Sequence, residues 1–373
     1  MRKLSIIVIA CILFGFLGAR AALAENAVVG VNVLGEDQIG DAEQEALAQQ
    51  LQDNGVKVIR TGLGGKNGRY TSFVIAAHRH GIDSVVIVNP NVGNTQKHMA
   101  PADKSLNRPW GATALQDANP EGFSKYFSAE LVKLDAASVR VVAFEIGNEL
   151  NSSPNNGDFL NPTSGRILTL SDLYNPGDPD GRSVATGYLA YIKILAAAKE
   201  LRGESAINKT TPVLTGMQAW WEVPNAPKYS NMTGANMSDS IEFLRQNGAD
   251  KLVDGYAVHL YSGGTPRSYS QRLNLLGSGL RECKSGGSPK KCWVTEWAFN
   301  NANRSCPLDD SARLRLVQEE RDAYKEFVQQ ERIAALLYYS WSEEYVGHRE
   351  GPPGVIFRCG ALTDAGKLAL SPF

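Results

Sequence analysis

The chain has 373 residues, of which 43% are hydrophobic, and its 38 basic residues nearly balance 39 acidic ones. These ordinary apolar and charged contents exclude an intrinsically disordered chain. A near-neutral chain without clusters of Lys and Arg lacks the charge that nucleic-acid phosphates require, so we expect no nucleic-acid partner.

The N-terminus has the pattern of a secretory signal peptide. Met1-Arg2-Lys3 is basic, an apolar run extends from Leu4 to Gly18, and Ala22-Leu23-Ala24 supplies small residues before a cleavage point. A membrane anchor is the alternative, but the run is short for a membrane span. We predict that residues 1–24 are removed and that one domain, residues 25–373, is secreted or periplasmic without membrane attachment. The removed segment carries three basic residues and no acid, so the formal net charge falls from −1 to −4.

Four cysteines remain after the predicted cleavage, because Cys11 leaves with the signal. An even number of cysteines in an exported protein indicates two disulfides, for which three pairings are possible. We predict Cys283–Cys292, which would close a short loop, and Cys306–Cys359, which would join two late loops. A zinc site is the alternative, but the sequence has no CxxC pair and no close His partner.

Strand patterns alternate with helical patterns along the predicted mature chain. The strands are apolar without polar alternation, which is typical of a parallel sheet buried on both faces. In chain order the predicted strands are 28–33, 56–60, 83–88, 139–146, 212–215, 252–258, 292–295 and 335–340. The predicted helices between them are 41–54, 70–80, 121–136, 184–201, 238–246, 270–280 and 311–330.

Eight such strands separated by helices predict the α/β class and a single (β/α)8 TIM barrel. A doubly wound open sheet is the alternative, but no Gly-rich phosphate-binding turn follows the first strand. The segments after the third, fourth and fifth strands, 89–119, 149–182 and 216–237, are long. Because each follows a strand, we expect these loops at the C-terminal face, where such barrels place their sites.

Two of the predicted strands end in a glutamate. Phe144-Glu145-Ile146-Gly147-Asn148-Glu149 ends the fourth strand, and Cys292-Trp293-Val294-Thr295-Glu296 ends the seventh. Retaining glycoside hydrolysis uses two carboxyl groups about 5–5.5 Å apart, one as nucleophile and one as acid and base. Glu149 and Glu296 are therefore candidate catalytic residues, whereas Glu145 lies deeper in its strand and is predicted to be a buried, paired acid.

In these motifs and in its strand order, the sequence resembles the retaining (β/α)8 glycoside hydrolases of clan A, with features of family 5 and family 39-like members. The resemblance implies that Glu149 is the acid/base and that Glu296 is the nucleophile. It further implies that Arg60 and Tyr261 contact the nucleophile. Asn148 is implied to bind a sugar hydroxyl, and Trp341 to form the floor of the sugar subsite. His259 matches the strand-six pattern of the same group. Arg or Tyr beside a carboxylate would hold it ionised and aligned.

Several tryptophans suggest a cleft that binds an oligosaccharide chain, because an indole face suits the apolar face of a sugar. We expect Trp110, Trp220, Trp221 and Trp297 in this cleft, with packing of the loops onto the barrel as the alternative. Many relatives have Pro after the acid/base Glu, whereas this chain has Leu150, so we expect the fourth loop to leave differently.

The sequence thus predicts a monomeric retaining glycosidase that acts on a β-linked polysaccharide or oligosaccharide, with no metal and no organic cofactor. Two alternatives remain, which are a non-catalytic glycan-binding barrel and a transglycosylase. Other acids have simpler interpretations, since Asp309-Asp310 precedes a helical pattern and Glu343-Glu344 is expected to be a solvated loop pair.

Overall fold

The computed structural model describes residues 27–92, 99–100, 112–216, 232–284, 288–301, 305–342 and 354–373. Within these ranges, parallel strands close into a barrel in the order β1-β12-β11-β10-β8-β6-β3-β2, which confirms the predicted (β/α)8 fold. The barrel strands are β1 (Val28–Asn32), β2 (Val58–Gly62), β3 (Asp83–Val88), β6 (Ala143–Ile146), β8 (Val213–Thr215), β10 (Gly255–His259), β11 (Lys291–Trp297) and β12 (Ile333–Tyr338).

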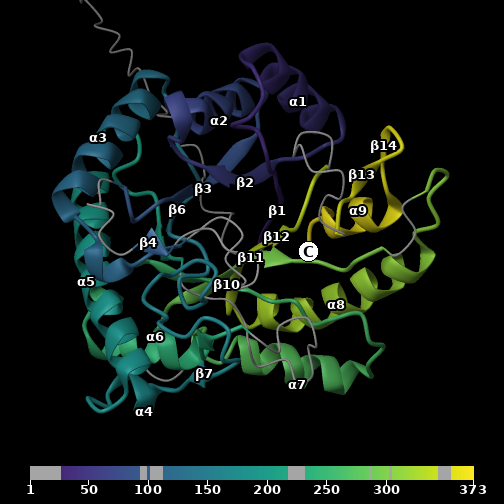
Figure 1. Cartoon of the computed structure of the whole chain (residues 1–373). Helices are drawn as coiled ribbons and strands as arrows, with labels where there is room; N and C mark the ends of the chain where they lie inside the picture. The colour runs from purple at the N-terminus through teal and green to yellow at the C-terminus, as the bar shows by residue number, and fades with distance from the viewer. Residues whose placement is uncertain are drawn as a thin grey trace, which may run out of the picture.

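Helices surround the barrel as an outer layer (Figure 1). Most begin at a residue that caps the first turn, as Asn119 does for α3 and Asp178 for α5 by accepting a backbone hydrogen bond. The outer helices are α1 (Asp41–Asp53), α2 (Arg69–Arg79), α3 (Pro120–Ala136), α4 (Leu170–Leu173), α5 (Pro179–Glu204), α6 (Met237–Gln246), α7 (Tyr269–Gly279), α8 (Ser311–Gln329) and α9 (Asp364–Ala369).

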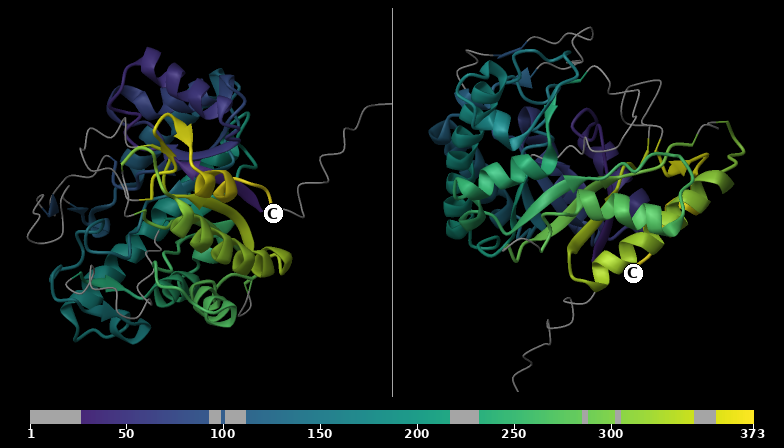
Figure 2. Two further views of the ribbon diagram at one scale, coloured as in Figure 1. Left: turned by 90° about the vertical axis from the view of Figure 1, so that its right-hand side faces the viewer. Right: turned by 90° about the horizontal axis from the view of Figure 1, so that it is seen from below.

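The predicted long loops carry short elements of their own. They include two-stranded pairs formed by β4 with β5 and by β7 with β9, and a third pair of β13 with β14 precedes α9. Their bounds are β4 (Met99–Ala100), β5 (Ala112–Thr113), β7 (Ile167–Leu168), β9 (Gly234–Ala235), β13 (Phe357–Arg358) and β14 (Ala361–Leu362). Helix α9 packs on α8, so the yellow C-terminal end of the chain lies beside that helix (Figure 2).

The apolar core has two layers, because side chains alternate across each strand. One face of the strands fills the barrel with residues such as Val58, Ala143, Ala257 and Leu337. The opposite face packs against the helices in a much larger cluster. The alternation of side chains along each strand therefore determines which of the residues that follow the strand face the barrel mouth.

Both predicted disulfides are confirmed, since Cys283 bonds to Cys292 and Cys306 bonds to Cys359. Disulfides of this kind fit the export that the sequence predicts. Among the residues that the structure describes, none of the helices combines the length and the apolar character that crossing a membrane would need.

Candidate active site

Glu296 reaches the barrel mouth because β11 carries an irregularity. Trp293 fills the barrel interior, and regular alternation from it would turn Glu296 outward. The register of β11 shifts between Val294 and Trp297, as it does opposite His259 of β10. An extra residue in a strand reverses the phase of those that follow. Thr295 and Glu296 therefore both face the centre, where Thr295 Oγ1 donates to Glu145 at 3.2 Å.

Arg60 makes hydrogen bonds to several residues of the site, and its side chain is only 2% exposed. It lies two residues after Val58 on β2 and so points inward at the mouth. Its Nε and Nη2 donate to the two oxygens of Glu145 at 2.7 and 2.9 Å, and its Nη1 donates to Glu296 Oε1 at 2.7 Å. Nη2 also donates to Asn148 Oδ1 at 2.7 Å. One guanidinium thus fixes side chains from β6 and β11, and Glu145 is the buried, paired acid that the sequence predicts.

Asn32, at the end of β1, is a member of this network that sequence reasoning missed. Its Oδ1 accepts from Arg60 Nη1 at 2.8 Å, and its Nδ2 donates to the Thr295 carbonyl at 2.9 Å. The amide therefore ties Arg60 to the irregular segment of β11. No motif marked Asn32 in the sequence, although its position at the end of an apolar strand was the available signal.

The turn after β6 presents Asn148 and Glu149. Gly147 has φ of 96°, and a Cβ there would lie 2.4 Å from Leu150 Cδ1, so this position requires glycine. Glu149 itself has a φ of 48°. Residues other than glycine rarely adopt this left-handed backbone conformation, and those that do are frequent at functional sites. Asn155 Nδ2 donates to Glu149 Oε2 at 3.3 Å, which makes Asn155 a second contact that the sequence did not indicate.

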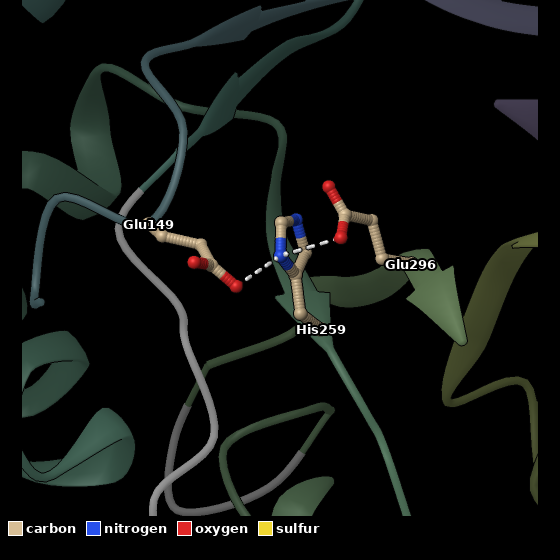
Figure 3. A group of neighbouring side chains, drawn as sticks. All are labelled: Glu149, His259 and Glu296. Atoms are coloured by element: carbon tan, nitrogen blue, oxygen red, sulfur yellow. Dashed lines mark hydrogen bonds and ion pairs between the residues drawn. The ribbon is translucent and has the colours of Figure 1, made fainter. Parts of the chain in front are cut away.

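His259 lies between Glu149 and Glu296 (Figure 3). Its Nδ1 is 2.8 Å from Glu149 Oε1 and 3.4 Å from Glu296 Oε2. Tyr261, on the same segment, donates from its hydroxyl to Glu296 Oε2 at 2.5 Å. Ligand atoms of His259 and the two glutamates all lie within 4.8 Å of one another. The structure thus brings together six of the residues singled out in the sequence, namely Arg60, Asn148, Glu149, His259, Tyr261 and Glu296.

Opposite charges dominate the electrostatics of the site. Burial alone would lower the pKa of His259, but the charge of Glu296 and hydrogen bonds with Glu145 and Glu149 raise it to about 9. Burial acts to raise the pKa of Glu145, yet the Arg60 charge outweighs it and holds that pKa below its usual value. The pKa of Tyr261 is raised well above its ordinary value by burial and by the charge of Glu296, so this phenol stays a hydrogen-bond donor.

Glu149, His259 and Glu296 also form a group with metal-ligand spacing. The donor atoms of this group already contact protein partners, since His259 Nδ1 is 2.8 Å from Glu149 Oε1 and Tyr261 donates to Glu296 Oε2. The Arg60 guanidinium, 2.7 Å from Glu296, already supplies positive charge to the same carboxylate. The contacts among these residues are those of a proton-bearing hydrogen-bond network.

A cavity of about 520 Å³ adjoins Glu296. It extends over the carboxyl ends of β1, β2 and β3, and Arg60, Asn148 and Tyr339 also line it. Tyr339 makes an edge-to-face contact with Tyr261 at a centroid distance of 6.4 Å. A second cavity, of about 290 Å³, is lined by Asn148 and by Asn155, the partner of Glu149.

Two tryptophans lie elsewhere than the sequence predicts. Trp341 is 1% exposed, stacks on Phe357 and donates from Nε1 to Gln50 of α1 at 3.0 Å, so its indole belongs to the core. In this segment the aromatic residue that lines the cavity is Tyr339, two residues beyond the inward-facing Leu337. β12 has ended before Trp341, so strand phase no longer sets its direction.

Trp297 is also a core residue, 1% exposed, with edge-to-face contacts to Tyr324 and Tyr338. The irregularity that turns Glu296 inward turns Trp297 outward toward α8. The other predicted cleft residues, Trp110, Trp220 and Trp221, lie outside the described residues, as does Glu343-Glu344. Asp309-Asp310 directly precedes α8, as predicted for a helix start.

Comparison with known proteins gives similarity in structure only, since no protein-family model matches the chain and no curated protein matches it. An endo-1,4-β-mannanase from Rhizomucor miehei is similar with a TM-score of 0.55 and 12% identity, over 92% of this chain and 93% of that one. A family 5 xyloglucanase from Paenibacillus pabuli has a TM-score of 0.54 and 12% identity, over 93% and 98% of the two chains. A fungal β-1,4-galactanase has a TM-score of 0.51 and 13% identity, over 92% and 93%.

These solved structures share the barrel across nearly the whole of both chains. The predicted barrel fold is therefore shared with these solved structures, one of which is named as a family 5 enzyme. At such low identity the likeness concerns the fold alone.

Proposed function

We propose that the protein is a retaining glycosidase that acts on a β-linked polysaccharide or oligosaccharide. The observation that carries the proposal is the short distance between Glu149 and Glu296. A carboxylate oxygen of Glu149 lies within 4.8 Å of a carboxylate oxygen of Glu296. Retaining enzymes hold their two carboxyl groups about 5–5.5 Å apart, whereas inverting enzymes hold them about 6.5–9.5 Å apart. The structural neighbours named as mannanase, xyloglucanase and galactanase support the same class of substrate.

In the first step, the Glu296 carboxylate attacks the anomeric carbon while the bond to the leaving oxygen breaks. Glu149 gives its proton to that oxygen, and the sugar stays on Glu296 as an ester. In the second step, water attacks the same carbon, Glu149 takes its proton and the bond to Glu296 breaks. Atoms and protons balance without an added metal or redox group.

The surrounding contacts support these assignments. Arg60 and Tyr261 each donate to one oxygen of Glu296, which fixes the direction of that carboxylate. Glu149 is the more exposed of the two, with 27% of its side chain accessible against 10% for Glu296. That exposure suits a residue that donates a proton to the leaving oxygen and then accepts one from water.

The test is a digestion panel of β-glucans, mannans, xylans and galactans, with products identified by mass spectrometry. Wild type should release oligosaccharides from at least one polymer, and Glu149→Gln and Glu296→Gln should each lose activity on the order of 10²–10⁴-fold. Glu204→Gln, at the exposed end of α5, is the matched control and should keep full activity. Intact turnover in both active-site variants would overturn the proposal.

A further inference from the structure

A buried carboxyl group in the wall of the larger cavity has no role in the steps above. Glu36 follows β1, is 1% exposed and lines the cavity that Glu296 also lines. Its Oε1 accepts a hydrogen bond from Thr61, whereas its Oε2 has no hydrogen-bond partner in the described part of the chain. Leaving a buried acceptor unpaired is unfavourable, and native proteins rarely contain such a group without a reason.

Among the described residues, no Lys, Arg or His forms an ion pair with Glu36, and the charge of the adjacent Asp37 acts on it unfavourably. Burial raises the pKa of Glu36 to about 7, with a smaller contribution from Asp37, and it outweighs the lowering effect of Thr61 and of the backbone of Glu36 and Gly62. The nearby Arg60 is already engaged by Glu145 and Glu296. This part of the cavity therefore favours a hydrogen-bond donor and disfavours a second anion.

Two aromatic side chains complete the same wall. The Tyr70 ring packs so closely on Gly62 and Gly65 that a Cβ at either position would lie within 2.7 Å of it. Tyr126 packs in the same way on Gly64 and donates from its hydroxyl to the Leu63 carbonyl at 2.6 Å. Fixed aromatic faces suit the C–H face of a sugar ring, as a carboxyl group suits its hydroxyls.

The cavity lies on the nucleophile side of the site. Glu296 and Arg60 line it, whereas Asn155, which donates to Glu149, lines the smaller cavity, and Asn148 lines both. The sugar that stays bonded to Glu296 in the proposed mechanism would therefore occupy the larger cavity. Its volume of about 520 Å³ is within the usual range of small-molecule sites.

We propose that Glu36 determines sugar specificity by accepting a hydrogen bond from a hydroxyl or amino group of the sugar on the Glu296 side of the scissile bond. The site would thus select neutral or amino sugars and reject uronic acids. This inference rests on the proposed glycosidase function, and it assigns a role in specificity to a residue outside the catalytic pair.

The test uses three oligosaccharides that share one linkage and carry a neutral sugar, an amino sugar or a uronic acid at the retained position. Wild type should prefer the neutral or the amino form over the uronate by on the order of 10-fold or more in kcat/KM. The better of the two accepted forms identifies whether a hydroxyl or an amine is bound. Glu36→Gln should raise KM for that form by on the order of 10-fold with a smaller change in kcat, and should reduce the discrimination against the uronate.

Glu36→Asp keeps the carboxyl group but withdraws it by one methylene, so it should also raise KM. If Glu36→Gln fails to fold, the KM of Glu36→Asp tests the role of Glu36 in its place. Glu204→Gln is the control and should leave KM and preference unchanged. If wild type cleaves these substrates and both Glu36 variants keep its KM and preference, the assignment of Glu36 is overturned. If wild type cleaves none of the polymers in the digestion panel, the proposed function fails instead.

Discussion

Arg60 and Glu145 are joined by two hydrogen bonds of 2.7 and 2.9 Å inside the barrel mouth, where both side chains are almost fully buried. The same guanidinium holds Glu296 and Asn148, so the pair supports the geometry of the whole site. Bidentate Arg–carboxylate contacts combine energy with a fixed direction. This relationship makes Glu145 important for stability although it takes no part in the proposed chemistry.

Replacing Glu145 should therefore destabilise the protein strongly. Glu145→Gln leaves the buried Arg60 charge with one fewer anion and turns an amide toward its N–H groups, so we expect a loss of about 3–5 kcal/mol. Urea unfolding at pH 7 measures it. Glu204→Gln, on the exposed end of α5, should stay within about 0.5 kcal/mol of wild type. A loss as small as that control's would contradict the role assigned to the pair.

Stability should fall between about pH 4.5 and 7 because of Glu36. Burial raises its folded pKa from 4.5 to about 7, so its stabilising effect is complete below the unfolded pKa and is lost as pH rises through the folded one. The difference corresponds to roughly 3 kcal/mol. Thermal unfolding of wild type and Glu36→Gln at pH 4.5 and pH 8 measures it, and the variant should lose less stability than wild type over that interval. Equal losses would show that Glu36 titrates normally.

Tyr339 and Trp341 should separate binding from stability. Tyr339 lines the cavity, so Tyr339→Ala should weaken substrate binding, with KM raised on the order of 10-fold. Trp341 is buried against Phe357, so Trp341→Ala should cost about 3–5 kcal/mol of unfolding free energy. Kinetics and urea unfolding of both variants provide the comparison. The reverse pattern would restore the original expectation that Trp341 contacts sugar.

The two disulfides should differ in their contribution to stability. Cys306–Cys359 spans 53 residues, against 9 for Cys283–Cys292, and a longer closed loop restricts the unfolded chain more. On the chain-entropy model the paired Ser variants should lose about 4 and about 2.5 kcal/mol, respectively. Denaturant unfolding without reductant measures both. A larger loss from opening the short loop would show that local packing outweighs chain entropy.

The barrel and much of its mouth were predictable from the sequence, for physical reasons. Apolar runs separated by helical patterns predict the barrel, and a strand end fixes the location of residues such as Arg60 and Glu149 at the mouth. The direction of Trp297 was not predictable, because an irregularity in β11 reverses its phase and only pairing with β10 and β12 reveals it. Asn32 and Glu36 were missed because neither belongs to a motif, and their roles come from neighbours distant in the chain.

The most direct test of the central claim is mass spectrometry of the protein after reaction with a 2-deoxy-2-fluoro β-glycoside of the sugar that the digestion panel identifies. The fluorine slows hydrolysis of a glycosyl ester, so the covalent intermediate of a retaining enzyme accumulates. After reduction and trypsin digestion, the mechanism predicts one glycosyl adduct on the peptide from Cys292 to Arg304, at Glu296. An adduct on another carboxylate, or none from an enzyme that turns over the parent glycoside, would contradict it.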